Sequence, residues 1–238
     1  MHRRCEQEGV LSARVGVVVF PGACDEQDAL LAVDRVEGLE AQFLPHGERD
    51  LKGSDAVVLP GGFSYGDYLR VGAIARFAPV MGAVGELARD GGPVLGICNG
   101  FQVLCEAGML PGALLVNESL KFVCRQVLLR VESTRTPFTS GLAESDELSM
   151  PVKHTTGRWF APPDLLERVE DAGQVVLRYA GGTNPNGSLR NVAGVANEAG
   201  NVFGLMPHVE HASDELTGST DGLRLFGSLA RHLSAFPA

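Results

Sequence analysis

A cysteine with a glycine two residues away on either side is the residue best suited to chemistry in this sequence. Cys98 lies in the segment Gly96-Ile97-Cys98-Asn99-Gly100, between an apolar run at residues 93–97 and a helix-like segment. The same glycine spacing occurs in the G-x-S-x-G elbow, where small neighbours permit a sharp turn that exposes the nucleophile. A helix that starts at Asn99 also directs unpaired N–H groups at the sulfur and favours a thiolate. The segment predicts a cysteine nucleophile, although a buried cysteine in a tight turn explains the same five residues.

A histidine and a glutamate further along the chain offer a base and the group that orients it. His208 and Glu210 follow the apolar run 202–206 and Pro207. Side chains two residues apart in an extended or turn segment share one side, so Glu210 can bond one imidazole nitrogen and leave the other facing a thiol. If the runs 93–97 and 202–206 are parallel neighbours in one sheet, their carboxyl ends share an edge, where Cys98 meets His208. Taken alone, His208 is better explained as a solvated or structural histidine, and the Cys98 elbow reverses that preference.

Backbone N–H groups near the thiol are needed where negative charge develops on a substrate oxygen. Gly61 and Gly62 follow the apolar run 56–59, and no side chain obstructs their N–H groups. Together with the Asn99 N–H they predict an oxyanion hole, although Pro-Gly-Gly also forms simple turns. The other histidines are weaker candidates. His154 is expected either to line the cleft or to pack against Trp159. His46 is expected in a turn and His211 in solvent, and His2 and His232 lie near the chain ends.

The first half of the chain alternates apolar runs with helical patterns, which predicts consecutive βαβ units. We expect strands at 15–20, 39–44, 56–59 and 93–97, and helices at 25–36, with Asp25 as its cap, 74–88 and 101–107. Beyond residue 121 strands dominate, at 122–131, 152–154, 175–179, 192–196 and 202–206, before a helix at 221–233. These patterns predict a disordered leader at residues 1–13 and then one α/β domain over residues 14–238. Its central sheet is expected to be mixed, largely parallel and flanked by helices, flavodoxin-like, with the elbow at a strand-to-helix turn.

Composition narrows the functional classes. The 238 residues are 45% hydrophobic, which suffices for a sizeable core, and the net charge of −9 argues against nucleic-acid binding. The five cysteines are odd in number and contain no C-x-x-C pair, so we expect neither a disulfide framework nor a metal site. No apolar run is long enough for a membrane span and no signal segment opens the chain, which predicts a cytoplasmic protein without membrane contact.

Three segments occur in an order that resembles the class I glutamine amidotransferases. They are PGGFSYGDYLRVGAIARFA at 60–78, GICNGFQ at 96–102 and GLMPHVEHA at 204–212. More narrowly, the GGFSYGDYLR block, the stretch 120–125, PNGS at 185–188 and DGLRLF at 221–226 are similar to the glutaminase subunits of phosphoribosylformylglycinamidine synthases. The resemblance extends from residue 15 to about residue 233, so residues 14–238 are expected to form a type 1 glutamine amidotransferase domain.

The resemblance implies hydrolysis of L-glutamine to glutamate and ammonia through a γ-glutamyl thioester. It also assigns roles to particular residues. These are the nucleophile for Cys98, base and then acid for His208, the orienting carboxylate for Glu210, oxyanion donors for Gly62 and Asn99, and substrate binding for Gln102 and Gly61.

The resemblance further implies two protein partners. A large synthetase subunit would use ATP and Mg²⁺ to convert formylglycinamide ribonucleotide to formylglycinamidine ribonucleotide in purine (IMP) biosynthesis, with a small accessory subunit alongside. This chain is expected to bind no cofactor, and it contains no G-x-x-x-x-G-K loop for a nucleotide. The sequence departs from the family at Val209 and His211, where proline and arginine are usual, at Val71, where cysteine is usual, and at residues 155–158, where an acidic, glycine-rich stretch is usual.

Two other classes of function fit parts of the sequence. Another class I amidotransferase or a stand-alone cysteine hydrolase would use the same elbow and His–Glu pair, but the GGFSYGDYLR block disfavours both. A non-catalytic scaffold subunit of a synthetase would not need a nucleophile and a base. The presence of Cys98, His208 and Glu210 together therefore disfavours the scaffold.

Overall fold

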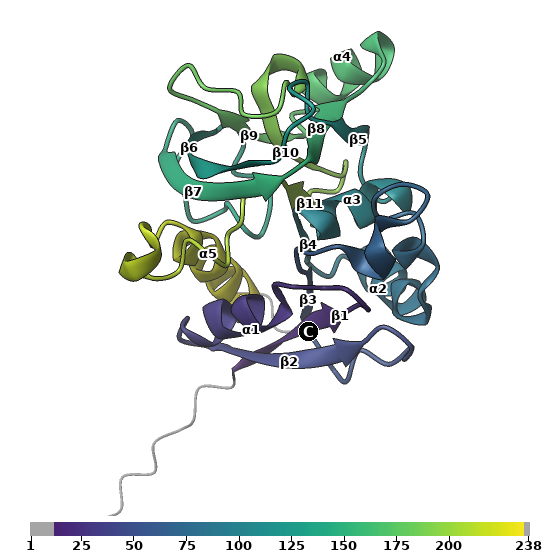
Figure 1. Ribbon diagram of the computed structural model, residues 1–238. Coiled ribbons are helices and arrows are strands. Elements are labelled where there is room, and N and C mark those ends of the chain that lie inside the picture. Colours follow the sequence, from purple (N-terminus) through teal and green to yellow (C-terminus); the bar gives the residue numbers. More distant parts are fainter. Residues whose placement is uncertain (1–11, 236–238) are drawn as a thin grey trace, which may run out of the picture.

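A computed structural model describes residues 12–235 of the protein and shows a nine-stranded sheet flanked by helices (Figure 1). Its order is β2-β1-β3-β4-β11-β10-β9-β6-β7; the first five strands run parallel and the others antiparallel. The α/β fold with a mixed central sheet is confirmed. The parallel strands are β1 (Ala13–Val19), β2 (Leu39–Pro45), β3 (Ala56–Leu59), β4 (Val94–Ile97) and β11 (Val202–Leu205), and the antiparallel ones β6 (Val123–Val131), β7 (Glu147–His154), β9 (Val175–Tyr179) and β10 (Val192–Ala196).

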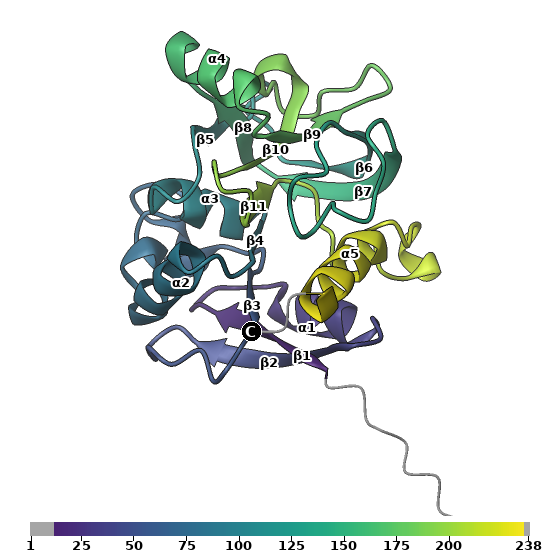
Figure 2. The same cartoon turned by 180° about the vertical axis from the view of Figure 1, so that it is seen from behind.

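Helices cover both faces of the parallel half. Figures 1 and 2 show α1 (Glu26–Asp34) and α5 (Gly222–Ala235) together on one face, and α2 (Pro79–Arg89) and α3 (Asn99–Glu106) on the other. Between these layers every residue of β3, β4 and β11 is buried, as continuous apolar runs in a parallel sheet require. No helix within residues 12–235 is long and apolar enough to cross a membrane.

Glycines let α3 lie directly against the strands beneath it. A Cβ on Gly100 would lie 2.0 Å from the carbonyl oxygen of Leu59, and one on Gly204 would lie 2.2 Å from a ring carbon of Phe101. Gly96 has the same constraint, because its Cβ would lie 2.7 Å from the carbonyl carbon of Gly100. The glycines on both sides of Cys98 therefore serve close packing of the turn, which fixes where α3 begins.

The antiparallel half contains elements that the sequence did not predict. The expected strand at 152–154 is the end of the longer β7, whose middle carries Pro151. Proline is tolerated there because β7 is the edge strand of the sheet. Also unpredicted are the two-stranded sheet of β5 (Ala113–Val116) and β8 (Thr156–Phe160) and the helix α4 (Pro163–Asp171), which is short and buries Val169 alone completely.

The helix expected at 74–88 is also corrected. A short 3₁₀ turn covers Ala75–Phe77, Ala78 is extended with ψ 140°, and α2 starts at Pro79. A proline forces the preceding residue out of the helical region but fits the first helical position, so the helix restarts there. The other expected elements agree with the structure within two residues at each end. Residues 1–11 of the predicted leader at 1–13 lie outside the described residues. Ala13, the last residue of that leader, belongs to β1.

Candidate active site

Cys98 occupies the turn between β4 and α3, as the glycine spacing predicts. Its backbone has φ 49° and ψ −101°, a left-handed conformation that is strained for a residue with a side chain. Its N–H donates to the carbonyl of Leu205 in β11 at 2.8 Å, and only 6% of the residue is exposed. The neighbouring strand therefore holds the strained turn in place and presents the sulfur at the carboxyl end of the sheet.

His208 reaches the same place because β4 and β11 are parallel neighbours. Their register pairs Ile97 with Leu205, so both chains leave the sheet at one edge, and Cys98 and His208 line one cavity of about 160 Å³. The His208 N–H donates to the carbonyl of Pro151 in β7 at 2.8 Å, which fixes the backbone of the loop. The parallel pairing required for Cys98 to meet His208 is thus present.

Glu210 bonds the imidazole of His208. The distance from His208 Nδ1 to Glu210 Oε1 is 2.5 Å, and both side chains are buried. Burial opposes a charged imidazolium, but the Glu210 carboxylate and the adjacent Cys98 sulfur outweigh it and raise the pKa of His208. Nε2 has no hydrogen-bond partner within the described chain. An imidazole oriented through Nδ1 and free at Nε2 has the geometry of a base for the neighbouring thiol.

The two backbone N–H groups predicted to bind an oxyanion, those of Gly62 and Asn99, lie in or next to the turns that carry the cavity residues Gly62 and Cys98. Gly62 pairs with Ala23 in an isolated antiparallel bridge whose hydrogen bonds come from the N–H groups of Cys24 and Phe63, so the Gly62 N–H takes no part in it. The φ of 140° at Gly62 suits glycine alone, because a Cβ would lie 2.6 Å from the Cys24 nitrogen. Asn99 is the first residue of α3, so its N–H has no acceptor within the helix. Neither N–H therefore donates to a backbone acceptor among the described residues, and the predicted role of both as oxyanion donors stays a prediction.

The side chains of Asn99 and Gln102 hold the cavity wall together. Asn99 Oδ1 accepts from the Ser64 N–H at 3.0 Å, and its Nδ2 donates to Gln102 Oε1 at 2.8 Å. Gln102 Nε2 in turn donates to the Thr156 carbonyl at 2.5 Å, which ties α3 to β8. Both ends of the Gln102 amide thus bond the protein. Its contact with substrate, expected because Gln102 lines the cavity, stays a prediction.

Gly61 leaves room for neighbouring side chains. A Cβ at this position would lie 2.3 Å from Asp25 Oδ2 and 2.7 Å from His208 Cε1. The predicted role of Gly61 in substrate binding is untested, whereas its steric role follows from these distances.

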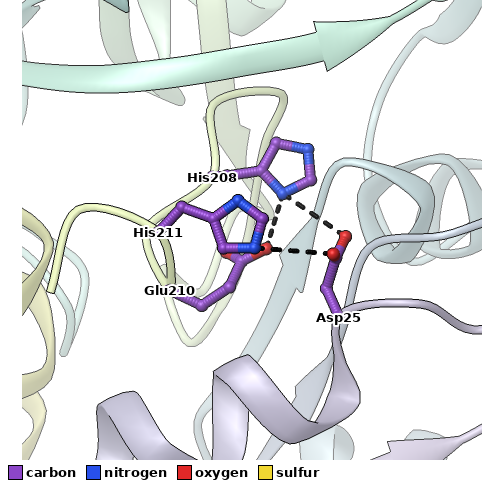
Figure 3. A group of neighbouring side chains, drawn as sticks. All are labelled: Asp25, His208, Glu210 and His211. Carbon is purple, nitrogen blue, oxygen red and sulfur yellow. Dashed lines mark hydrogen bonds and ion pairs between the residues drawn. The ribbon is translucent and has the colours of Figure 1, made fainter. Parts of the chain in front are cut away.

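Asp25 is a site residue that the sequence analysis missed. It precedes α1, but its side chain makes no capping hydrogen bond. Its Oδ1 lies instead 2.5 Å from Lys153 Nζ. Its Oδ2 lies 3.6 Å from His208 Nδ1, toward which the carboxylate points (Figure 3). Burial alone would raise the pKa of this carboxyl, but hydrogen bonding to His211 and the charges of His208 and Lys153 hold it well below its usual range. Its place after β1, at the same sheet edge as Cys98, was the available signal.

His211 is not a solvated histidine, contrary to expectation. Its ring stacks on that of His208, with centroids 5.1 Å apart and planes 16° from parallel. Its Nε2 lies 3.5 Å from Asp25 Oδ1 and 3.3 Å from Asp28 Oδ2, and 24% of its side chain is exposed. His211 therefore belongs to the group of side chains that surrounds the base.

Four of these side chains, Asp25, His208, Glu210 and His211, present metal-ligand atoms within 4.8 Å of one another (Figure 3). Some of these ligand atoms already bond other protein groups. His208 Nδ1 bonds Glu210, and the Lys153 ammonium contacts Asp25, so positive charge comes from the protein itself. This arrangement does not favour a cation, and the expected absence of a metal stays a prediction.

His154 and His46 each bond a neighbouring side chain. His154 lines the cavity, with its Nε2 3.1 Å from Asn186 Nδ2, so the predicted cleft position is confirmed. Burial and the charge of His208 lower the pKa of His154 to about 4. His46, in the turn after β2, bonds the Tyr65 hydroxyl at 2.8 Å.

Comparison with known proteins finds relatives of this chain. The sequence profile of the CobB/CobQ-like glutamine amidotransferase domain matches residues 12–224. The phosphoribosylformylglycinamidine synthase subunit PurQ of Rubrobacter xylanophilus is 61% identical over 216 residues, which cover 91% of this chain and 97% of the relative. PurQ of Frankia casuarinae is 59% identical over 226 residues, covering 94% and 96% of the two chains.

A solved structure has the same fold. A chain in the structure of PurLQS from Thermotoga maritima superimposes with a TM-score of 0.85 at 42% identity, covering 93% of this chain and 99% of that one. By sequence and by structure, the chain belongs to the glutamine amidotransferases and, within them, to the PurQ family of phosphoribosylformylglycinamidine synthase subunits.

Proposed function

We propose that this chain hydrolyses glutamine with a Cys98-His208-Glu210 triad and supplies the ammonia to phosphoribosylformylglycinamidine synthase. One observation carries the proposal: the parallel pairing of β4 and β11 places Cys98 and His208 on the wall of one cavity. That cavity, about 160 Å³, is below the roughly 300 Å³ at which pockets for drug-sized ligands begin, so it suits a single amino acid.

The first half of the reaction forms the thioester. His208 takes the proton of the Cys98 thiol through Nε2, and the sulfur attacks the side-chain carbonyl carbon of glutamine. The N–H groups of Gly62 and Asn99 receive the negative oxygen of the tetrahedral intermediate. His208 then returns its proton to the amide nitrogen, the C–N bond breaks, and ammonia leaves behind a γ-glutamyl thioester.

The second half releases glutamate. His208, now neutral, removes a proton from a water molecule that attacks the thioester carbonyl, and the C–S bond breaks with return of a proton to sulfur. Glutamine and water thus become glutamate and ammonia. Through both halves Glu210 keeps the ring oriented and offsets the charge that His208 carries while it holds a proton.

The partners follow from the relatives. The similar Thermotoga maritima chain comes from a PurLQS assembly, so we assign to this chain a large PurL-type synthetase subunit and a small PurS-type subunit. We propose that the synthetase uses ATP and Mg²⁺ to convert formylglycinamide ribonucleotide to formylglycinamidine ribonucleotide with this ammonia, in purine biosynthesis. This chain would bind no cofactor itself, and we place the complex in the cytoplasm. The described cysteines, Cys24, Cys98, Cys105 and Cys124, are all free, which is consistent with a reducing compartment.

The test uses Cys98→Ala in the reconstituted complex. We expect glutamine-dependent synthesis to fall by a factor of roughly 10⁴ or more, as when other nucleophiles are removed, while synthesis from added ammonia continues. Cys124→Ala, which removes an exposed thiol outside the cavity, is the matched control and should leave both rates unchanged. Equal loss of both activities in Cys98→Ala would exclude a role as ammonia supplier. Full glutaminase turnover without any partner would instead favour a stand-alone hydrolase.

A further inference from the structure

One buried carboxylate beside the base has no role in the triad mechanism. The side chain of Asp25 is 3% exposed, and its Oδ2 has no hydrogen-bond partner among residues 12–235. This oxygen lies 3.6 Å from His208 Nδ1, the same nitrogen that bonds Glu210 (Figure 3). A buried carboxylate is costly unless something compensates its charge, so its presence here calls for a reason.

Two features fix Asp25 in this orientation. Lys153 of β7 bonds Oδ1 at 2.5 Å. Gly61 leaves the space that the carboxylate occupies, since any Cβ there would lie 2.3 Å from Oδ2. The side chain accepts no hydrogen bond from the N–H groups at the start of α1, which it precedes. The carboxylate is therefore oriented toward His208 by contacts from β7 and from the loop after β3, and capping does not account for it.

We propose that Asp25 is a positioning residue, whose carboxylate is a second acceptor facing His208 Nδ1 and is held there by Lys153. The inference rests on the proposed function, because it concerns the base of that reaction. His208 must serve three different atoms in turn: the thiol sulfur, the leaving nitrogen and the attacking water. With Glu210 at 2.5 Å and Asp25 at 3.6 Å, the Nδ1–H keeps a charged acceptor nearby while the ring adjusts between these atoms.

The charges around His208 determine what removal of Asp25 does. The groups that face the ring are the carboxylates of Glu210 and Asp25, the ammonium of Lys153, the rings of His154 and His211, and the Cys98 sulfur. Asp25→Asn keeps the shape of the side chain, removes one negative charge and leaves the Lys153 charge uncompensated. Both electrostatic changes disfavour the protonated His208 ring.

The test measures the protonation of His208 without any catalysis. In a Cys98→Ala background, with histidine carrying isotope labels in the ring, NMR follows the titration of His208. Asp25→Asn is expected to lower its midpoint by about one pH unit or more, as for loss of a carboxylate within 4–6 Å. Asp28→Asn is the matched control, since Asp28 lies in α1, the helix that Asp25 precedes, and contacts His211 but is half exposed. The control should leave the midpoint within about a tenth of a unit.

A second measurement uses the reconstituted complex. Asp25→Asn in the otherwise natural chain is expected to reduce kcat for glutamine about tenfold with little change in KM, while ammonia-dependent synthesis is retained. An unchanged His208 midpoint in folded Asp25→Asn, checked by thermal unfolding, would overturn the proposal even if activity fell. A change confined to KM would overturn it as well, because it would make Asp25 a substrate contact. Failure of the unaltered complex to use glutamine would overturn the proposed function alone, since the NMR titration does not depend on turnover.

Discussion

Replacing Gly61 by alanine adds one methyl group next to the base. The backbone at Gly61 is not left-handed, so alanine is sterically allowed by the main chain. The new Cβ would start 2.7 Å from His208 Cε1 and 2.3 Å from Asp25 Oδ2. To reach an ordinary contact of 3.4 Å, the ring must move by 0.7 Å and the carboxylate by 1.1 Å. The substitution therefore displaces the base without removing any catalytic group.

These displacements set the expected magnitudes. A misplacement of about 1 Å at a reacting group can cost roughly 100-fold in rate, so we expect kcat for glutamine to fall by about 10- to 100-fold. Overpacking a buried site costs about 1–3 kcal/mol, which the lower entropy of the unfolded alanine chain offsets by about 0.4–1 kcal/mol. The free energy of unfolding should thus fall by about 1–2 kcal/mol. The measurements are glutamine- and ammonia-dependent synthesis in the complex, and urea unfolding of the chain.

A matched variant separates crowding of the site from a general effect of alanine. Gly82 lies within α2, and a Cβ there would meet no atom within 4 Å. Gly82→Ala should leave glutamine-dependent synthesis unchanged and stabilise the chain by about 0.5–1 kcal/mol, because alanine favours the helix. If Gly61→Ala kept more than half of the natural rate, the reasoning that the exact place of His208 limits catalysis would be refuted.

Two further variants test the groups around the ring. Glu210→Gln should impair glutamine-dependent synthesis less than Cys98→Ala, since it loses a charge and an orienting partner but keeps the nucleophile; equal residual rates in the two variants would contradict this ranking. The pKa of His154 is about 4 in the folded chain, below the ordinary value of 6.5 that applies in the unfolded chain. The stability that neutral His154 contributes is therefore present above pH 6.5 and is lost as the pH falls toward 4. The loss amounts to about 3 kcal/mol, and His154→Asn should remove it from urea titrations across this range. An unchanged pH slope in that variant would show that His154 does not carry the effect.

The fold was predictable where local sequence decides structure. The bounds of β3, β9 and β10 agree with their apolar runs because these runs are buried and end at turn residues. Pro151 hid most of β7, since a proline indicates a break unless the strand is known to lie at a sheet edge. Edge position is a property of the whole sheet, so no local pattern reveals it.

The site residues, too, were predictable only where neighbouring residues in the sequence indicate their arrangement. The glycines around Cys98 and the two-residue spacing of His208 and Glu210 are local signals, and both predicted arrangements are present. Asp25 has a strong local interpretation as a helix cap, which hides its contact with Lys153, 128 residues away in the chain. The sequence likewise predicts a solvated His211, because its contacts with Asp25 and Asp28 join residues far apart in the chain and leave no local pattern.

The antiparallel half of the sheet takes part in the site, although every predicted catalytic residue lies at the edge of the parallel half. Strand β7 is separated from β11 by β10, β9 and β6, yet it contacts the loop that follows β11. Pro151 fixes the His208 backbone, Lys153 holds Asp25, and His154 lines the cavity. The sheet must therefore curl until its edge strand returns to the carboxyl ends of the parallel strands, as Figure 1 shows for β7. Because Pro151, Lys153 and His154 of β7 all contact the base or its surroundings, disruption of this edge strand should disable the triad even though β7 contributes no member of it.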